Sequence, residues 1–559
     1  MAREYGGISH GVDYTASPAA VDRKAPDCGR PLDRAKPTAI RRILDYGAGG
    51  SMTRRVCAGA TVARPWQWLA IAAVLLVAHV SRAAGPLGGN GDPIRTSAYK
   101  VDLVQTPVVG GSRLTGIAGA YVAIAEGTDG NTQTPASPAV RVPYSYDYFD
   151  YDLGIGLTMT SVLRNTDFFN TGRSTDLDAR QTGFVFLTPA LNLTYGSFGF
   201  GLTIELQHYD LSQTDPVTNE RHKLGADFVT GHVQVANSFF DQQLTLGMGA
   251  RVVSLTLNDP SAEQQQLFST EGVGAEFGLL IRPNEQQYRI GAAFRSSVTT
   301  TALTNSRVQP NAQGDRILGT GPEQTDALWL PNNVALPWDL NVGFALMLGP
   351  RRFNPFWYYD EQGLDTLQRN VAARRAQRRQ QAQQWLERAQ KEGRNLEAQR
   401  SALAAEDARQ SALEAQELTE HERHARAALK RRYAAMSRRY LLLTTSLVLT
   451  GAVHDAVTVP SFLSRVVDRS GREVVVSPRF GLETETVPNW VKVRAGSYVE
   501  PTRSDAGLMR VHGTLGLEAK VFPWTVFGLW EEGSEWRISG ALDVAQRYLG
   551  WGISIGNWH

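Results

Sequence analysis

The sequence predicts an all-β transmembrane barrel of about 14 antiparallel strands, interrupted by an inserted α-helical hairpin. Three observations support this fold class. Short segments in which apolar and polar residues alternate recur along most of the chain. The links between these segments alternate between short turns and long polar loops. One segment near the middle has the composition of α-helices. The length of 559 residues would also allow several soluble domains, so the barrel is predicted from these three observations and not from the length.

The alternation is clearest in the stretch FGLLIRPNEQQYRIGAAFRSSV, residues 277–298. Successive side chains of a strand point to opposite faces, so Phe277 and Ile281 share one face while Glu276 and Gly278 share the other. The same pattern returns after a tight turn. In a soluble β-sandwich the apolar face would form the core, whereas in a membrane barrel it would contact lipid. This stretch alone does not distinguish the two folds.

Similar segments recur, each near the ~9 to 11 residues that a tilted strand needs to cross a bilayer. They begin near residues 152, 182, 197, 224, 241, 272, 286, 336, 440, 473, 490, 508, 535 and 547. An even number of strands is typical of closed bacterial barrels. Glycine and charged residues recur on the less apolar face, which would form a poor dry core.

The lengths of the links favour the membrane barrel. Short links occupy residues 195–197, 237–241, 282–285 and 486–489. Long polar links occupy residues 165–180, 210–223, 258–270, 299–331 and 452–472. Outer-membrane barrels have short periplasmic turns and longer external loops, which a soluble sandwich does not need. The short link at 546–547 and the longer one at 522–534 depart from this alternation.

The N-terminal region predicts export. From Met52 the chain has a basic opening, a short apolar run and a small-residue end, the plan of a signal peptide over residues 52–84. We expect cleavage near Ala83 or Ala84. Residues 1–51 then form an over-extended or disordered N-terminus, the alternative being a genuine extension. Cys28 and Cys57 fall outside the mature chain, so no disulfide is expected.

Several segments resemble FadL-like outer-membrane transporters of long-chain fatty acids and other hydrophobic compounds. They are the hairpin above, LPWDLNVGFAL and VPNWVKVRAGSYVEPTR. GGSRLTGIAGAYVAIAEGTDG resembles that family's N-terminal segment, which folds inside the barrel as a plug. The resemblance implies a plug at residues 85–150, barrel strands 1–8 at 151–363 and barrel strands 9–14 at 441–559. The chain departs from the family where Ser137, Pro138 and Ala139 replace the usual Asn-Pro-Ala of the plug motif, and where His559 follows Trp558 at the end.

The resemblance implies passive uptake of long-chain fatty acids or other hydrophobic compounds through the bacterial outer membrane, among whose lipids the barrel would lie. Strand parity points five arginines inward, where they could bind a carboxylate head group. They are Arg251, Arg289, Arg295, Arg494 and Arg537. The alternative is that they line a wet lumen in pairs with Glu205, Glu276 and Asp543.

Residues 364–440 form the helical, coiled-coil-like insertion, which parity places at a periplasmic turn. The two strands it joins should be neighbours about 4.8 Å apart, whereas ~70 helical residues would reach ~105 Å, so the insertion must fold back on itself. The turn is predicted at 393–395 or near 406–411. Its 17 basic and 10 acidic residues could contact a periplasmic protein, cell-wall polymer or another copy, or the arm could be a solvated spacer. An exported chain would rarely meet nucleic acid.

No nucleophile elbow, HExxH motif, Walker loop or metal-ligand cluster stands in the sequence, so we expect neither an enzyme nor a cofactor. The spacing of His208, His222 and His232 matches no standard site. The alternative function is a structural or scaffold barrel that binds a periplasmic or secretion partner through its helical arm. A transporter should bind fatty acid inside the barrel, whereas a scaffold should co-purify with its partner.

Overall fold

The computed structural model describes most of the chain after the predicted signal peptide. The described residues run from 87 to 557, except 142–148, 161–166, 173–184, 215–220, 260–264, 301–308, 319–327, 356–360, 506 and 522–534. The predicted signal peptide, the segment 1–51 and the last two residues lie outside them.

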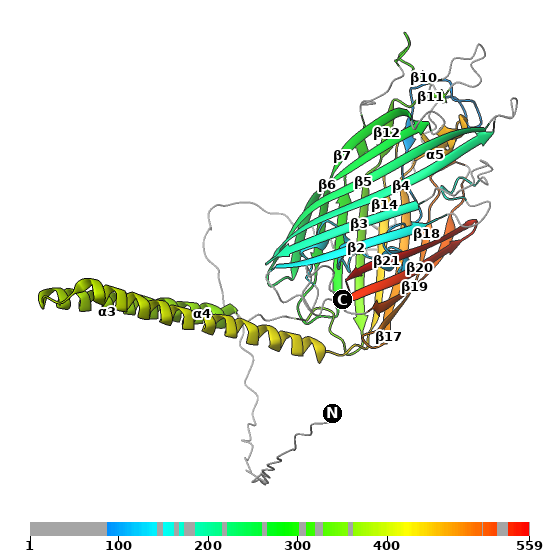
Figure 1. Ribbon diagram of the computed structural model, residues 1–559. Helices are drawn as coiled ribbons and strands as arrows, with labels where there is room; N and C mark the ends of the chain where they lie inside the picture. The colour runs from blue at the N-terminus through cyan, green and yellow to red at the C-terminus, as the bar shows by residue number, and fades with distance from the viewer. Residues whose placement is uncertain are drawn as a thin grey trace, which may run out of the picture. The chain divides into compact units, whose positions relative to one another are not determined.

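Fourteen antiparallel strands close into a barrel, as predicted. Figure 1 shows the barrel and the helices that leave it. The strands, in chain order, are β2 (Phe149–Met159), β3 (Val185–Tyr195), β4 (Phe198–Thr214), β5 (Arg221–Phe239), β6 (Leu244–Asp259), β7 (Gln265–Ile281), β8 (Tyr288–Arg295), β13 (Asp339–Leu348), β14 (Leu441–Thr450), β17 (Val475–Val487), β18 (Val491–Glu500), β19 (Arg510–Val521), β20 (Trp536–Ala545) and β21 (Tyr548–Asn557). Pairing of β2 with β21 closes the barrel.

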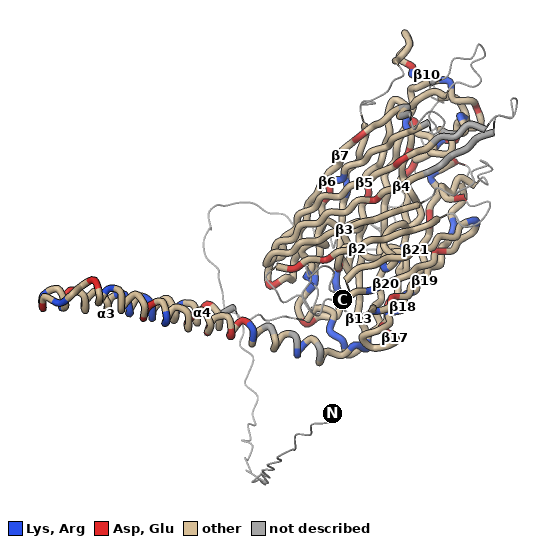
Figure 2. The backbone as a smooth tube through the Cα atoms, viewed as in Figure 1, with Lys and Arg blue, Asp and Glu red and all other residues tan. Residues whose placement is uncertain are grey.

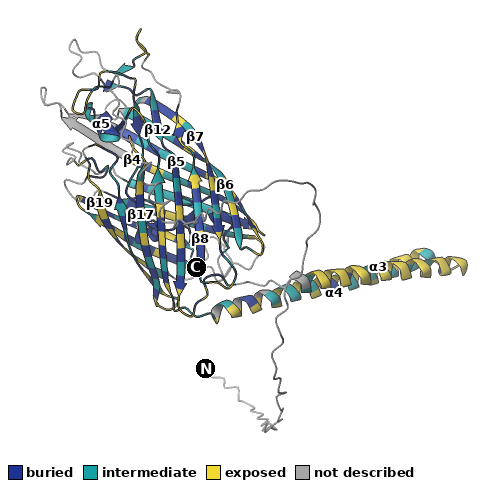
Figure 3. Cartoon of the chain, turned by 180° about the vertical axis from the view of Figure 1, so that it is seen from behind, coloured by how far each residue is buried: buried dark blue, intermediate teal, exposed yellow. Residues whose placement is uncertain are grey.

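The apolar face of the strands points outward. In the β7–β8 hairpin, Phe277 pairs with Phe294, and their side chains are 50% and 40% exposed. Glu276 and Arg289 on the other face are buried. Exposed and buried residues alternate in this way along the strands (Figure 3). This inside-out arrangement is that of an outer-membrane barrel and excludes the soluble sandwich.

The two ends of the barrel differ as the link lengths predict. At one end of the barrel, short turns connect β3 to β4, β5 to β6, β7 to β8 and β17 to β18. We call this end the turn end. Longer links, some carrying small strands of their own, lie at the other end, the loop end, where the two-residue link between β20 and β21 is an exception. Strands β4 to β7 have 17, 19, 16 and 17 residues, more than the ~9 to 11 needed to cross the bilayer, so they extend beyond it.

A small sheet, which we call the cap, covers the lumen at the loop end. Its strand order is β16 (Arg469–Ser470), β15 (Ala456–Thr458), β1 (Lys100–Asp102), β12 (Asn333–Leu336) and β9 (Val298–Thr299). The N-terminal strand β1 runs parallel to both β12 and β15. Asp102 accepts a hydrogen bond from Arg503 Nε at 2.8 Å, which ties the cap to the link after β18. The cap therefore brings the N-terminal segment and three loop-end links together.

The chain then passes through the lumen as residues 104–141, the plug. It contains α2 (Ser112–Gly116) and two 3-10 turns, η1 (Thr128–Gly130) and η2 (Ser137–Ala139). Helix α2 contacts β18 to β21, η1 contacts β2 and β3, and η2 contacts β3 to β6. Residues 117–125 are almost completely buried. Fourteen strands around an internal N-terminal plug is the architecture that the resemblance to FadL-like transporters implies.

Glycines on the inner face make room for the plug. A Cβ at Gly247 would lie 2.0 Å from the carbonyl oxygen of Pro135, and one at Gly291 would lie 2.1 Å from that of Val122. Both distances are far below van der Waals contact. The inner-face glycines seen in the sequence are thus explained by close approach of the plug backbone to the wall.

The insertion forms an antiparallel hairpin of two helices between β13 and β14, which we call the arm. Helix α3 (Glu361–Lys391) and helix α4 (Leu396–Ala434) are joined at Gly393, whose φ is +69°. The Asn395 side chain caps α4 by accepting hydrogen bonds from the backbone N–H groups of Glu397 and Ala398. The predicted turn at 393–395 is confirmed, and the alternative at 406–411 is wrong because those residues lie inside α4. No described helix is long and apolar enough to cross a membrane.

The contact between α3 and α4 follows a repeat of 11 residues. Covered positions in α3 are Leu364, Leu367, Val371, Arg375, Arg378, Ala382, Leu386 and Ala389, at steps of 3, 4 and 4. In α4 they are Leu396, Gln399, Leu403, Asp407, Gln410, Glu414, Leu418, His421, Ala425 and Leu429. A repeat of 11 residues corresponds to about 3.67 residues per turn, which is closer to the 3.6 of a straight α-helix than the 3.5 of a heptad repeat. The middle of the seam is ionic, since Glu414 accepts hydrogen bonds from Arg375 Nε at 2.8 Å and from Arg378 Nη2 at 3.1 Å.

We expect Gly247→Ala to destabilise the plug. Its new Cβ must displace the backbone at Pro135, and overpacking of this kind costs about 1–3 kcal/mol. Urea unfolding in detergent measures the loss. The control is Gly540→Ala, also in a barrel strand, where the nearest atom to the new Cβ lies at 3.8 Å. Equal stability of the two variants would show that the plug does not pack as described.

We expect the arm to lose stability in acid. Hydrogen bonds from Arg378, and then from Arg375, lower the pKa of Glu414 from its ordinary 4.5 to about 2. A lowered carboxylate pKa stabilises the folded state fully above pH 4.5, and that contribution is lost as the pH falls to about 2. The helical far-UV circular dichroism signal should fall in this window. Glu414→Gln should reduce the helical signal at neutral pH and shrink the acid transition, whereas the exposed-site control Glu387→Gln should leave both unchanged. An identical acid transition in wild type and Glu414→Gln would contradict the assignment.

Candidate binding chamber

A cavity of about 200 Å³ lies inside the barrel between the cap and the plug. Its cap side is formed by Leu103 and Leu336, and its plug side by Thr132 and Gln133. The wall side chains come from β4, β5, β6, β8, β13, β14 and β17. We call this cavity the chamber. It exists because the plug fills only part of the lumen and the cap covers the rest.

Charged side chains line the chamber and most of them are paired. His232 Nδ1 lies 2.9 Å from Glu276 Oε1, and its Nε2 lies 3.5 Å from Glu205 Oε2. Asp339 forms ion pairs with Arg295 Nη1 at 2.7 Å and with Arg251 Nη1 at 3.3 Å. Arg295 Nε lies 3.3 Å from Glu276 Oε1, whereas Arg251 Nε is buried without a hydrogen-bond partner and retains donor capacity.

Arg479 is the chamber cation without a carboxylate partner among the described residues. Its Nη1 donates only a long hydrogen bond of 3.5 Å to the backbone oxygen of Gly119 in the plug. Its Cζ lies 6.0 Å from the centre of the Tyr498 ring, and its Nε has no partner. A half-buried guanidinium that is not neutralised favours an anionic ligand, because a carboxylate can accept hydrogen bonds from its planar donors.

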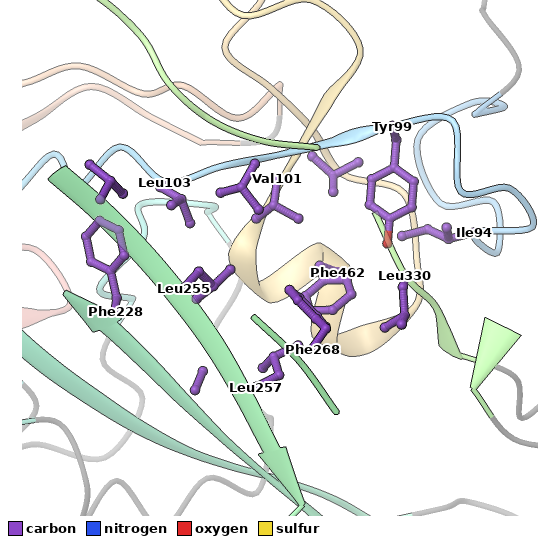
Figure 4. Close-up of a cluster of buried hydrophobic side chains, with 14 of the residues drawn as sticks. Ile94, Tyr99, Val101, Leu103, Phe228, Leu255, Leu257, Phe268, Leu330 and Phe462 are labelled. Carbon is purple, nitrogen blue, oxygen red and sulfur yellow. The ribbon is translucent and has the colours of Figure 1, made fainter. Parts of the chain in front are cut away.

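An apolar pocket adjoins the chamber under the cap. Its volume is about 20 Å³, and it shares Leu103, Gln105 and Phe228 with the chamber lining. Its other lining residues are Val101, Phe169, Ala226, Leu255, Leu257, Val459 and Phe462. Figure 4 shows several of these side chains gathered between the cap and the upper parts of the wall strands. The space in the lumen is therefore amphipathic, apolar near the loop end and charged toward the plug.

The structure divides the five predicted inward arginines into two groups. All five point into the lumen, as strand parity predicts. Arg251 and Arg295 line the chamber. Arg289, Arg494 and Arg537 instead contact carboxylates between the plug and the wall. Of the five, only Arg251 and Arg295 are therefore candidate ligand-binding residues.

A chain of ion pairs fixes the plug to β17 to β20. Arg494 donates to Glu483 at 2.6 Å and to Glu518 at 2.8 Å. Arg537 donates to Glu518 at 2.9 Å and to Asp129 of the plug at 2.9 Å. At the other end of the chain, Arg113 of the plug donates to both oxygens of Glu483, at 2.9 and 3.1 Å. We call these residues the plug network.

The plug network also reaches β8, which β13 and β14 separate from β17 in the barrel. Glu126 of the plug forms ion pairs with Arg289 Nη1 at 2.8 Å and with Arg113 Nη2 at 3.4 Å. Because each charge is buried, losing one partner leaves another uncompensated, which costs far more than a surface ion pair. The network thus sets one position for a segment that has little regular structure of its own.

The predicted plug motif packs against the wall. Thr194 Oγ1 donates to the Pro138 oxygen at 3.0 Å, and Ser238 Oγ donates to the Ala139 oxygen at 3.0 Å. Ser137 Oγ donates to the backbone oxygen of Gly127 at 2.9 Å, which closes the turn within the plug. These three residues are not among those that line the chamber. The motif therefore holds the plug, and its effect on a ligand would be indirect.

Sequence reasoning missed Arg479 and Glu483, although a signal was present. In β17, Val476 and Phe480 point outward, so Arg479 and Glu483 belong to the inner row. The plug residues Arg113 and Glu126 had no comparable signal, because an irregular segment has no period from which side-chain direction can be read.

The wall has an interruption next to the chamber. The pairing of β3 with β4 covers Val185–Leu187 and Ala190–Tyr195, but skips Thr188 and Pro189. Proline has no N–H to donate to the neighbouring strand. By register these two residues face Glu205 and Ile204, and Glu205 lines the chamber. Cross-strand hydrogen bonding is thus interrupted where the wall borders the cavity.

We expect Glu483→Gln to loosen the plug. The neutral amide removes the charge that faces Arg113 and Arg494 and brings an N–H₂ group toward their donors, which should lower the free energy of unfolding by about 3–5 kcal/mol. Urea unfolding in detergent measures this loss. The control is Glu271→Gln, at an exposed position of β7, which should stay within about 0.5 kcal/mol of wild type. A Glu483→Gln variant as stable as the control would refute the structural role of the network.

Comparisons with known proteins find matches between structures. No protein-family model matches the sequence, and no curated protein matches it. The P. putida toluene transporter TodX has a TM-score of 0.41 at 10% identity, covering 80% of this chain and 99% of that chain. The CymD monoaromatic hydrocarbon channel gives 0.39 at 9% identity, covering 80% and 96%. CdiB from Acinetobacter baumannii gives 0.30 at 6% identity, covering 74% and 60%.

Proposed function

We propose that the protein is an outer-membrane channel for passive uptake of hydrophobic compounds that carry an anionic head, with long-chain fatty acids as the expected class. The observation that supports this proposal is the amphipathic space inside the barrel. The apolar pocket under the cap has a volume of about 20 Å³, so it would hold only the end of a hydrocarbon tail, and the adjoining chamber holds Arg479, which has no carboxylate partner among the described residues.

Charge and polarity along the lumen support a carboxylate rather than a purely apolar ligand. Three arginines line the chamber, against the carboxylates Glu205 and Asp339. A hydrocarbon without a head group would leave these arginines desolvated and without a new partner, which costs free energy. A carboxylate placed at Arg479 would accept charge-assisted hydrogen bonds from it, with the spare Nε donor of Arg251 nearby.

The ligand could leave by movement of the plug or of the wall, and the structure favours the wall. The plug network ties the plug to five wall strands, β8 and β17 to β20. The interruption at Pro189 lies beside the chamber and has already lost cross-strand hydrogen bonds. Opening there needs fewer bonds to break than displacing the plug. This route would deliver a hydrophobic compound into the bilayer, where its tail is soluble.

The scaffold function is the alternative, and one observation favours it. Channel activity gives no role to the arm, whose two helices have 31 and 39 residues and would extend roughly 45–60 Å along their axes. A scaffold needs such a reach to meet a periplasmic protein or cell-wall polymer. A folded barrel that binds no fatty acid would shift the choice to this function.

We expect Arg479→Gln to weaken binding of a fluorescent long-chain fatty acid to the purified protein. Loss of a hydrogen bond to a charged group costs about 1.5–3 kcal/mol, which corresponds to a roughly ten- to hundred-fold higher Kd. Binding of the fatty alcohol of equal chain length should change by less than about twofold, because it has no charge to lose. Arg472→Gln, at an exposed position of the loop end, is the charge-matched variant and should bind both ligands as wild type does.

The outcomes separate the two parts of the proposal. If wild type binds neither ligand, the channel function fails. If it binds both but Arg479→Gln binds them as wild type does, the channel stands and the head-group site is wrong.

A further inference from the structure

Aromatic side chains mark the edge of the membrane at the turn end. Phe149 begins β2, Tyr195 ends β3 and Phe198 begins β4, while Phe240 and Trp490 lie in turns. All five are exposed, Phe240 by 73% and Trp490 by 56%. Aromatic residues gather at the boundary between lipid tails and head groups in membrane barrels. These five residues form the aromatic belt of the turn end.

The link from the arm to the barrel enters β14 at this end. Leu441 begins the strand and is exposed, whereas the neighbouring Tyr440 is buried and donates its hydroxyl proton to Glu483 at 2.9 Å. Arg439 is exposed and continues the outward row, two residues or roughly 7 Å before Leu441. The Arg439 oxygen accepts a hydrogen bond of 3.3 Å from Arg351 N, which holds the link against the turn end. Arg439 therefore lies beside the lipid-facing surface, where head groups are expected.

The residues that precede this point are strongly basic. From residue 423 to 439 the sequence holds seven Lys or Arg and no Asp or Glu. We call this segment the arm root. Figure 2 shows its basic residues in the last turns of α4 and in the link to the barrel. Arg423, Arg431, Arg432 and Arg439 are exposed. The guanidinium of Arg438 lies 4.7 Å from the Tyr433 ring centre.

Charge is segregated along α4. The part farther from the barrel, residues 396–422, contains seven acidic and two basic residues, the opposite of the arm root. Three of these acidic residues, Asp407, Glu414 and Glu417, form ion pairs with arginines of α3, and residues 364–422 as a whole hold ten basic and ten acidic residues. The positive excess of the arm therefore lies entirely in the arm root, at the membrane edge.

We propose that the arm root binds the anionic phospholipid head groups of the membrane leaflet at the turn end. Basic residues next to a membrane-spanning segment are attracted to anionic lipids, and this attraction decays within a Debye length of about 8 Å. The arm root is continuous with the lipid-facing row of β14 and adjoins the aromatic belt. A soluble polyanion would be served equally by charge anywhere on the arm, but residues 364–422, the arm outside its root, carry no net charge.

The test is competitive lipid binding to the full chain in detergent, read by native mass spectrometry. An equal mixture of phosphatidylglycerol and phosphatidylcholine is offered. Wild type should retain phosphatidylglycerol in about tenfold preference, and R431Q/R432Q/R438Q/R439Q should retain the two lipids about equally, because four of the seven root charges are gone. Heat-modifiable migration on gels shows that the barrel of each variant is folded.

The matched control is R388Q/K391Q/R400Q/R409Q, which removes the same charge around the arm's turn, at exposed positions. It should keep the preference of wild type. An equal loss in both variants would overturn the proposal, since the effect would then be one of net charge. It would also be overturned if wild type showed no preference, or if soluble glycerol phosphate displaced the lipid, which would indicate a site for free phosphate.

Discussion

The lumen of a barrel with 14 strands is too wide to be filled by the side chains of its own wall, and the rest of the structure follows from this constraint. The plug fills part of this lumen, but it has little regular secondary structure and needs contacts with the barrel wall to hold one position. The plug network provides these contacts. Arg494 is central to it, because it contacts Glu483, which binds Arg113, and Glu518, which binds Arg537 and through it Asp129.

The fixed plug in turn defines the space above it. Inner-face glycines such as Gly247 allow the plug backbone to lie against the wall, so the remaining volume is concentrated under the cap. The tall strands β4 to β7 raise Phe228 and Leu255 to the level of the cap, where they meet Leu103. The result is one continuous space with an apolar upper part and a charged lower part. Such a space suits an amphipathic ligand, and the wall beside it is interrupted at Pro189.

The fold could be predicted from sequence because strand parity and link length are local properties. The predicted start near 336 corresponds to Asp339 and that near 490 to Val491, while the largest difference is 272 against Gln265, where the strand extends beyond the bilayer. The inward direction of Arg251 and Arg537 also followed from parity. Their partners did not, because Asp339 is on β13, which β7 and β8 separate from β6, and the Arg537–Glu518 pair depends on the register of β19 with β20. The cap was not predicted either, since its strands of 2 to 4 residues leave no periodic signal.

The central claim is that a hydrophobic compound occupies the space between cap and plug with its head at Arg479. An experimental structure with a long-chain fatty acid brominated at its tail tests this most directly. The account predicts bromine signal in the pocket lined by Leu103, Phe228 and Leu255, and the carboxylate next to Arg479. Bromine signal confined to the lipid-facing surface, with the chamber holding only solvent, would contradict it.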